Sequence, residues 1–193
     1  MSKTKRKYLT ESEVEMLLRS ANKGVHASRN YCLILICFIH GLRASEACRL
    51  HISDVDLNSK CIHVRRLKNG FTTTHPLLDI EILALKSWIS SRSNYLHADS
   101  EWLFLSRKGN PLSRQQFYNI ISTSGYCSEL PLNVHPHMLR HSCGFALANM
   151  GLDTRLIQDY LGHCNIRHTV WYTASNAERF FGIWDKRKLK VRC

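Results

Sequence analysis

The longest uninterrupted apolar run, YCLILICFI, covers the nine residues from Tyr31 to Ile39 and sets the strongest constraint on the fold. Nine residues are too few to cross a bilayer, whose hydrocarbon core is about 30 Å thick. A helix that is apolar on every side is usually buried inside a protein, with other elements around it. The run therefore predicts a fully buried core helix, and Gly41 is a residue type that commonly ends one.

Capping signals predict the helices that surround this core helix. Thr10 and Glu13 form a capping box, and so do Ser113 and Gln116. Pro136 is well suited to the first turn of another helix. Helices are expected over residues 11–22, 45–50, 79–91, 113–124, 135–151, 153–162 and 177–184.

A β-hairpin is predicted in the stretch CIHVRRLKNGFTTTHPL, because β-branched residues flank the favoured turn pair Asn69-Gly70. Lys68 lies at the tip of this hairpin, and the later stretch EWLFLS predicts a short strand or a turn. The expected fold class is therefore mostly α with a small antiparallel β-sheet (α+β). We expect a single domain over residues 1–193, with a core at about 8–184 and a basic tail at 185–193.

The chain is strongly basic, since 27 lysines and arginines against 15 aspartates and glutamates give a formal net charge of +12. This excess predicts a polyanionic partner, most often nucleic acid, although a basic surface that serves only solubility stays open. No apolar stretch of a secretory signal follows the N-terminus, so the eight cysteines are expected to be reduced residues of a cytoplasmic protein. No CxxC pair or zinc-finger spacing occurs, and we expect no metal site.

Six side chains along the chain are suited to chemistry, and taken singly each also has an ordinary structural role. Arg43 could lie at a helix terminus and Lys68 at a solvated hairpin tip. His137 and Arg140 could form a polar pair on a helix surface. His163 could bond the last carbonyls of a helix, and Tyr172 could pack in the core. Ser45 is expected to cap the helix over residues 45–50, which leaves Arg43 in the turn before that helix. The six are Arg43, Lys68, His137, Arg140, His163 and Tyr172.

The motifs HGLRASE, HMLRH, LGH and TVWYT, in this order and with a hairpin lysine after the first, resemble the catalytic set of the tyrosine recombinases. This lambda-integrase family consists of site-specific DNA strand-exchange enzymes. The resemblance covers about residues 8–184, and it implies the fold of the integrase catalytic domain.

The resemblance implies how four of these side chains treat a DNA phosphodiester. Arg43 and Arg140 bind the non-bridging oxygens, on which charge builds in the transition state, and charged bidentate guanidinium groups suit that task. His163 donates to the same phosphate. His137, in the first turn of its helix, is a second donor or the proton acceptor for the tyrosine.

The resemblance also implies the covalent chemistry. Tyr172 is the nucleophile, and its bond to the DNA 3′ phosphate conserves the energy of the broken strand. No ATP, metal or other cofactor is then required. Lys68 resembles the hairpin lysine that protonates the departing 5′ oxygen. Glu46 matches an acid of the family and is expected to support the site rather than to react.

Most members of the family carry a separate helical clamp domain before the catalytic one, and this chain is expected to lack it. The stretches HPHMLRH, DTRLIQDYLGH and NIRHTVWYTASNAERF resemble the fimbrial phase-switch recombinases of bacteria in particular. Those DNA invertases turn a promoter-bearing segment between inverted repeats and so switch fimbrial expression. The expected general contacts to DNA, for each of which a solvated surface role stays open, are Arg65, Arg66, Arg107, Lys108 and Arg114.

The resemblance implies partners as well. Four protomers act on two double-stranded DNA sites, and the segment after the tyrosine docks on a neighbouring protomer. The helix over residues 177–184 suits this docking, although packing against its own domain stays open. DNA-bending accessory proteins and a location at the cytoplasmic nucleoid are expected, and no membrane partner.

Two other functions stay open. A type IB topoisomerase uses a similar residue set to nick and reseal one strand, but the small size and the closer motif match favour a recombinase. A catalytically idle DNA-binding regulator could keep the same fold, but the presence of all the reactive groups disfavours it.

Overall fold

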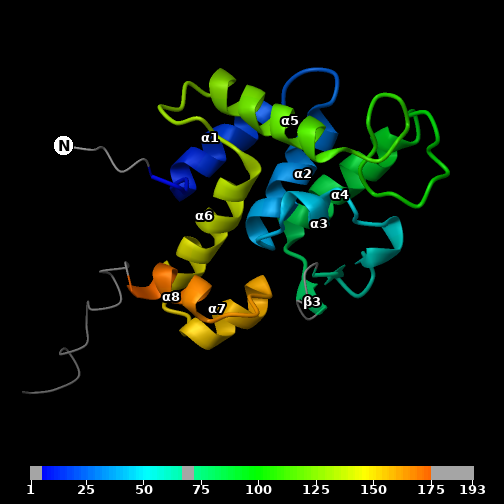
Figure 1. Ribbon diagram of the computed structural model, residues 1–193. Helices are drawn as coiled ribbons and strands as arrows, with labels where there is room; N and C mark the ends of the chain where they lie inside the picture. Colours follow the sequence, from blue (N-terminus) through cyan, green and yellow to red (C-terminus); the bar gives the residue numbers. More distant parts are fainter. Residues whose placement is uncertain (1–5, 67–71, 175–193) are drawn as a thin grey trace, which may run out of the picture.

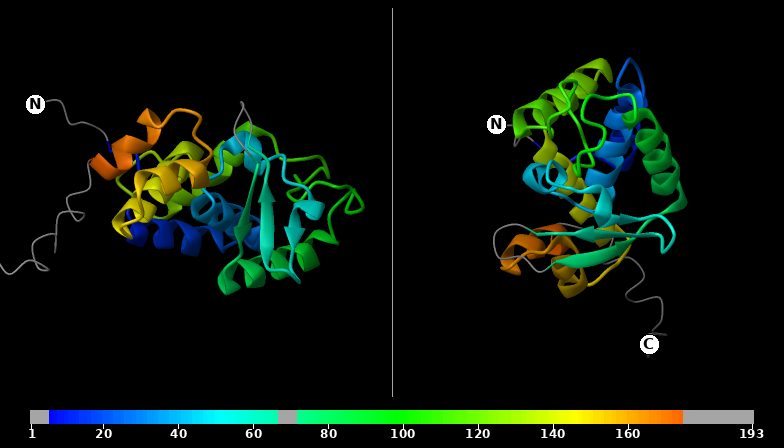
Figure 2. Two further views of the ribbon diagram at one scale, coloured as in Figure 1. Left: turned by 90° about the horizontal axis from the view of Figure 1, so that it is seen from below. Right: turned by 90° about the vertical axis from the view of Figure 1, so that its right-hand side faces the viewer.

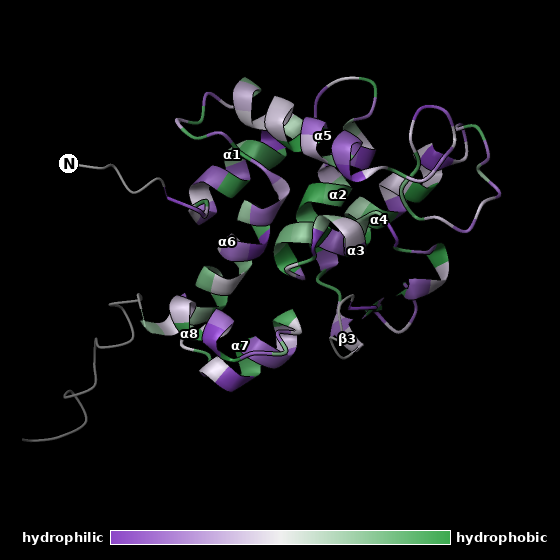
Figure 3. Cartoon of the chain, viewed as in Figure 1, coloured by the Kyte–Doolittle hydropathy of each residue, from purple (hydrophilic) through white to green (hydrophobic). Residues whose placement is uncertain are grey.

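The computed structural model describes residues 6–66 and 72–174, and α2 (Ala27–Ile39) lies at the centre of its main group of helices (Figure 1). Every side chain from Cys32 to Cys37 is buried, as expected for the apolar run. Figure 3 shows this helix as predominantly hydrophobic. Helices packed against α2 are α1 (Glu11–Ala21), α4 (Asp79–Arg92) and α6 (Pro136–Asn149), and α5 (Arg114–Cys127) covers α1.

The predicted capping signals are confirmed at both boxes. The Thr10 hydroxyl accepts a hydrogen bond from the backbone of Glu13, and Ser113 does the same for Gln116. These bonds satisfy amide groups that a helix start leaves without partners.

The predicted cap of the next short helix is wrong. Helix α3 (Ala44–Ala47) begins one residue before Ser45, and Arg43 occupies the N-cap position. The Glu46 carboxylate accepts the Arg43 backbone N–H at 2.9 Å, so an acid inside the helix replaces the expected serine. The capping bond therefore fixes the backbone of a proposed catalytic arginine.

A three-stranded antiparallel sheet in the order β1-β2-β3 lies beside the helices (Figure 2). Its strands are β1 (Val55–Asp56), β2 (Cys61–Val64) and β3 (Thr73–Pro76), and a 3-10 helix η1 (Ile52–Asp54) precedes them. The β2–β3 pairing matches the predicted hairpin, with Ile62 opposite His75. The predicted turn and Lys68 lie outside the described residues. The stretch EWLFLS forms no named strand, and makes isolated bridges from Trp102 to His51 and from Leu105 to Pro111.

Buried polar side chains attach β3 to the helices. His75 Nδ1 lies 3.1 Å from His40 Nδ1, and His40 Nε2 lies 2.8 Å from the Glu81 carboxylate. The His75 ring also packs against Tyr160, with 4.1 Å between ring centroids. Burial lowers the pKa of His75 to about 3, so this ring is neutral at pH 7. Strand β3, the second strand of the hairpin, is thereby held against the end of α2 and against α4.

The last described elements form a second, smaller apolar cluster on α6. Helices α7 (Thr154–Leu161) and α8 (Arg167–Ala174) pack on α6 and on each other at one end of the molecule (Figure 1). The cluster consists of Cys143, Ala148, Ile157, Leu161 and Tyr172. Helix α8 was not expected from the sequence, and the helix predicted over residues 177–184 lies outside the described residues. Within residues 6–66 and 72–174, no helix combines the length and apolarity needed to span a membrane.

Replacement of Trp88 by phenylalanine is expected to destabilise the main core. The Trp88 side chain is fully buried on α4, and its indole N–H donates to the Leu103 carbonyl at 2.9 Å. Losing this donor and part of the ring should lower the free energy of unfolding by about 1–3 kcal/mol in urea denaturation. Leu83→Ala on the exposed face of the same helix is the control and should change little. Equal effects of the two changes would contradict this account.

Candidate active site

Glu46 lies at the centre of a group of three arginines. Its carboxylate contacts Arg43 Nη1 at 2.6 Å and Arg66 Nη1 at 3.0 Å, and Arg140 Nη1 at 3.9 Å. The Glu46 side chain is almost fully buried. Burial alone would raise its pKa, but hydrogen bonds from Arg43 and the charges of Arg66 and Arg140 lower the pKa overall. The acid is therefore ionised and holds three like charges together, as the predicted supporting role requires.

Arg140 is positioned by two backbone carbonyls as well as by this acid. Its guanidinium donates to the carbonyl of Gly41, after α2, at 2.5 Å and to that of Leu161, at the end of α7, at 2.8 Å. The side chain is 2% exposed. Burial, and the neighbouring charges of Arg43 and Arg66, lower the pKa of Arg140 to about 10, which leaves the group charged at pH 7.

Arg43 differs from Arg140 in its access to solvent. Its side chain keeps 26% of its surface exposed, so it can meet a ligand from outside the domain. The two arginines thus combine a fixed internal charge with an accessible one, a pairing suited to an oxyanion that approaches the surface.

The prediction that Arg66 contacts DNA is wrong. Its side chain is fully buried and donates to Glu46, to the carbonyl of His40 at 3.0 Å and to that of Tyr160 at 2.6 Å. It joins the end of β2 to α2 and α7. The signal that predicts this is the period of two along the strand, because Ile62, Val64 and Arg66 all point inward.

The other predicted DNA contacts lie at the surface. Arg107, Lys108 and Arg114 are exposed, and Arg65 is half-exposed and paired with Asp54. The contacts of these four residues with DNA remain predictions, and so does the role of Lys68.

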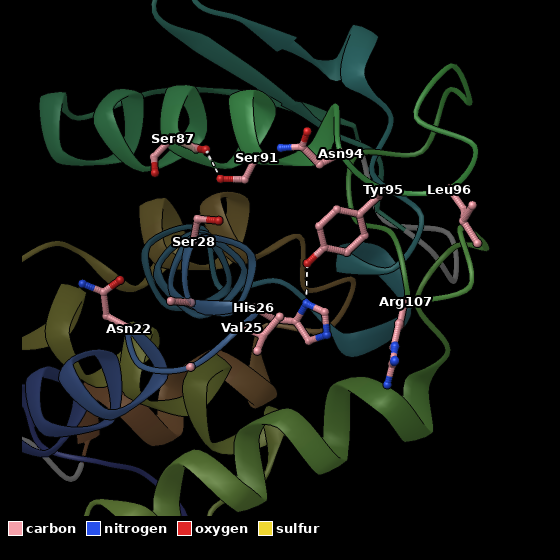
Figure 4. A pocket seen from close by; sticks show the side chains of 12 residues that line it. Asn22, Val25, His26, Ser28, Ser87, Ser91, Asn94, Tyr95, Leu96 and Arg107 are labelled. Carbon is pink, nitrogen blue, oxygen red and sulfur yellow. Dashed lines mark hydrogen bonds between the residues drawn. The ribbon is translucent and has the colours of Figure 1, made fainter.

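A pocket of about 630 Å³ lies away from this cluster, between the start of α2 and the loop that follows α4 (Figure 4). Arg107 is on its wall, and His26 Nδ1 lies 2.5 Å from the Tyr95 hydroxyl. Its described lining is mostly hydroxyl, amide and glycine groups. Nothing in this lining indicates a reactive group.

Tyr172 lies on α8 and is only 3% exposed. Its ring packs against Gly144, where an added Cβ would lie 2.7 Å from ring carbons, and edge-on to Phe145. Its hydroxyl lies 3.0 Å from His141 Nδ1. Burial raises the pKa of Tyr172 to about 12, so the phenol is protonated at pH 7.

His137 and His163 both precede this tyrosine in the sequence, and both belong to the same region of the structure. The His163 ring stacks on Tyr172 with 6.2 Å between centroids, and its Nδ1 lies 2.9 Å from the Thr169 hydroxyl. Burial, with the charges of Arg140 and Arg43, lowers the pKa of His163 to about 3. His137, in the first turn of α6, contacts the His141 ring edge-on at 4.5 Å.

Sequence reasoning missed His141 and Thr169. His141 stands in the motif HMLRH, four residues after His137, and this spacing places the two on one face of a helix. Thr169 carried no comparable signal, because its contact with His163 depends on the unexpected helix α8. Among the described residues, no three histidine, cysteine, aspartate or glutamate side chains lie together as metal ligands would.

Glu46→Gln is expected to lower the free energy of unfolding by about 3–5 kcal/mol, because it leaves buried arginine charges without their carboxylate. Urea denaturation at pH 7 measures this change. Glu15→Gln is the matched control: Glu15 pairs with Arg19 at 3.4 Å on an exposed face of α1, where such pairs contribute little. A loss at Glu46 no larger than at Glu15 would contradict the proposed role of the carboxylate.

A family model described as the phage integrase family matches residues 7–179. The chain is 72% identical over 188 residues to the type 1 fimbriae regulatory protein FimB of Escherichia coli (strain K12). This match covers 97% of the chain and 94% of FimB.

Solved structures of recombinases share the fold. The XerA recombinase has a TM-score of 0.82 and 27% identity, over 97% of this chain and 66% of its own. The XerH site-specific recombinase bound to its difH substrate has a TM-score of 0.75 and 28% identity, over 90% of this chain and 52% of its own. The chain thus spans about half to two thirds of those proteins. The predicted fold class and the resemblance to tyrosine recombinases are confirmed, and the chain belongs to the phage integrase family.

Proposed function

We propose that this chain is a site-specific tyrosine recombinase that cuts and rejoins double-stranded DNA through a 3′-phosphotyrosine intermediate. The observation that carries the proposal is the convergence of Arg43, Arg140, His163 and Tyr172 from four separate elements. The 72% identity to a type 1 fimbriae regulatory protein supports the narrower proposal that it inverts a promoter-bearing segment in fimbrial phase variation.

The arginine cluster supplies the binding energy for a phosphodiester. Three guanidinium groups share one carboxylate, so the cluster keeps an excess of positive charge in a partly dry environment. An anion placed there is stabilised by groups that are already oriented, and the gain grows as charge builds on the oxygens in the transition state. Arg43 binds from the accessible side, and Arg140 from inside the domain.

Cleavage then exchanges one bond for another. The Tyr172 oxygen forms a bond to phosphorus while the bond from phosphorus to the 5′ oxygen breaks, and the leaving oxygen takes a proton, in this proposal from Lys68. His163 donates from its ring to the phosphate. Rejoining reverses these steps with a 5′ hydroxyl from another strand, so neither ATP nor a metal ion enters the balance.

Binding to DNA is proposed to rest on surface cations. Arg65, Arg107, Lys108 and Arg114 contact phosphates along the duplex, which makes affinity fall steeply with salt. Two duplexes are held by four protomers, with residues 177–184 docking on a neighbour and DNA-bending proteins assisting, at the nucleoid of the cytoplasm. The complex of the similar XerH protein with its substrate supports the DNA partner.

Tyr172→Phe should abolish covalent attachment to a nicked suicide duplex that carries the target repeat, because the variant has no nucleophilic oxygen. Wild-type protein should give a protein–DNA adduct on denaturing gels, and both proteins should shift the duplex equally in a native gel. Tyr118→Phe, on the exposed surface of α5, is the control and should form the adduct normally. An adduct with the Tyr172 variant would exclude this residue as the nucleophile. Site-independent relaxation of plasmid DNA would favour a topoisomerase instead.

EDTA should leave the rate of adduct formation unchanged, because the proposed charges on the phosphate come from arginines rather than from a metal. The measurement is single-turnover cleavage with and without excess chelator at constant ionic strength. Loss of cleavage that added Mg²⁺ restores would overturn the metal-free mechanism.

A further inference from the structure

We propose that His141 is a catalytic residue that accepts the hydroxyl proton of Tyr172 as the tyrosine attacks phosphorus. This inference rests on the proposed function and assigns one of its proton transfers. The role had been open to His137, which the sequence resemblance suggests. The contacts of the tyrosine hydroxyl favour His141.

The first support is the contact itself. His141 Nδ1 and the Tyr172 oxygen lie 3.0 Å apart, within the range for a hydrogen bond and for direct proton transfer. The two residues come from different helices, α6 and α8, which pack on each other. Within the described part of the chain, the hydroxyl of Tyr172 makes its hydrogen-bond contact with His141, whereas His137 contacts the His141 ring edge-on.

The second support is the environment of the His141 ring. Burial, and then nearby basic groups, lower the pKa of His141 to about 4, so the ring is neutral at pH 7 and one of its nitrogens carries no proton. With Nε2 carrying the ring proton, Nδ1 is an acceptor for the phenol. The titratable or charged groups that face the ring are Lys7, His135, His137, Arg140 and Tyr172.

The third support is the need for an acceptor. Tyr172 is buried and its pKa is raised to about 12, so the phenol does not ionise by itself at neutral pH. In the proposed step the O–H bond breaks, its proton binds His141 Nδ1, and its electron pair forms the new oxygen–phosphorus bond. The 5′ oxygen departs with the electrons of the broken bond and is protonated from the other side of the phosphorus. Rejoining returns the proton from His141 to the phenol.

His141→Asn is the sharpest test, because the amide oxygen of asparagine can stand near the position of Nδ1 and accept the hydrogen bond, yet it cannot hold the proton. Single-turnover cleavage of the nicked suicide duplex should slow by about 100-fold or more. His97→Asn is the matched control: His97 is exposed and has a φ of 52°, a conformation that asparagine tolerates, so cleavage should stay at the wild-type rate. A His141 variant that cleaves within threefold of wild type would overturn the proposal.

A second measurement separates proton acceptance from positioning. Fluorotyrosine at position 172 has a more acidic phenol and needs less help from a base. It should therefore raise the cleavage rate of the His141→Asn variant at least tenfold. A duplex with a 5′-bridging sulfur needs no proton on its leaving group. On this substrate the His141→Asn variant should stay slower than wild type by the same factor, because the proposed role of His141 is at the tyrosine and not at the leaving group. A rate loss that fluorotyrosine does not reduce, or that the sulfur substrate removes, would overturn the role.

Failure of the broader proposal gives a different pattern. If wild-type protein forms no adduct through Tyr172, the recombinase function and the role of His141 both fall. If wild-type protein forms the adduct and only the His141 results disagree, the role of His141 falls and the recombinase function stands.

Discussion

The buried carboxylate of Glu46 is the interaction on which the rest of the site depends. It satisfies the backbone of Arg43 and neutralises part of the charge of Arg66 and Arg140. Transferring several charges from water into a domain is costly, and the cost is offset here by short contacts and by backbone carbonyls that accept the remaining N–H groups. Because those carbonyls belong to the ends of α2 and α7, the same contacts that stabilise the charges also fix how these helices meet.

Helix α6 connects the charge cluster to Tyr172, the proposed nucleophile. His137, Arg140, His141 and Gly144 recur at the spacing of one helical face. Along this stripe the first three side chains supply polar groups, and the glycine leaves room for the ring of Tyr172. In the proposed mechanism, one helix face therefore sets both the position of the phosphate and the path of the tyrosine proton.

Local signals predicted the elements that are strongly encoded in short stretches. The apolar run of α2 and the capping boxes of α1 and α5 each depend on neighbouring residues only, so they could be found from the sequence. The hairpin strands were predicted for the same reason, whereas the two-residue strand β1 is too short to give a pattern.

The remaining features depend on contacts between distant segments. Helix α8 has eight residues and no clear apolar stripe, and its packing on α6 makes it stable in the domain. Arg66 looked like a surface cation because arginine is seldom buried. The alternation along the strand indicates that it points inward, but its partners Glu46, His40 and Tyr160 are what make a buried charge tolerable there. The motif around Arg140 identified the family, but the partner of the Tyr172 hydroxyl became apparent only in three dimensions.

The near-complete burial of Tyr172 has a consequence for the safety of the genome. A protein with a net charge of +12 is attracted to DNA of any sequence. Under the proposed mechanism, the Tyr172 ring, which packs edge-on to Phe145 and against Gly144, keeps its nucleophilic oxygen away from a strand that only touches the surface. In the proposed mechanism, accidental breakage is limited by the free energy needed to bring a strand to this covered oxygen, which binding at the target site would supply.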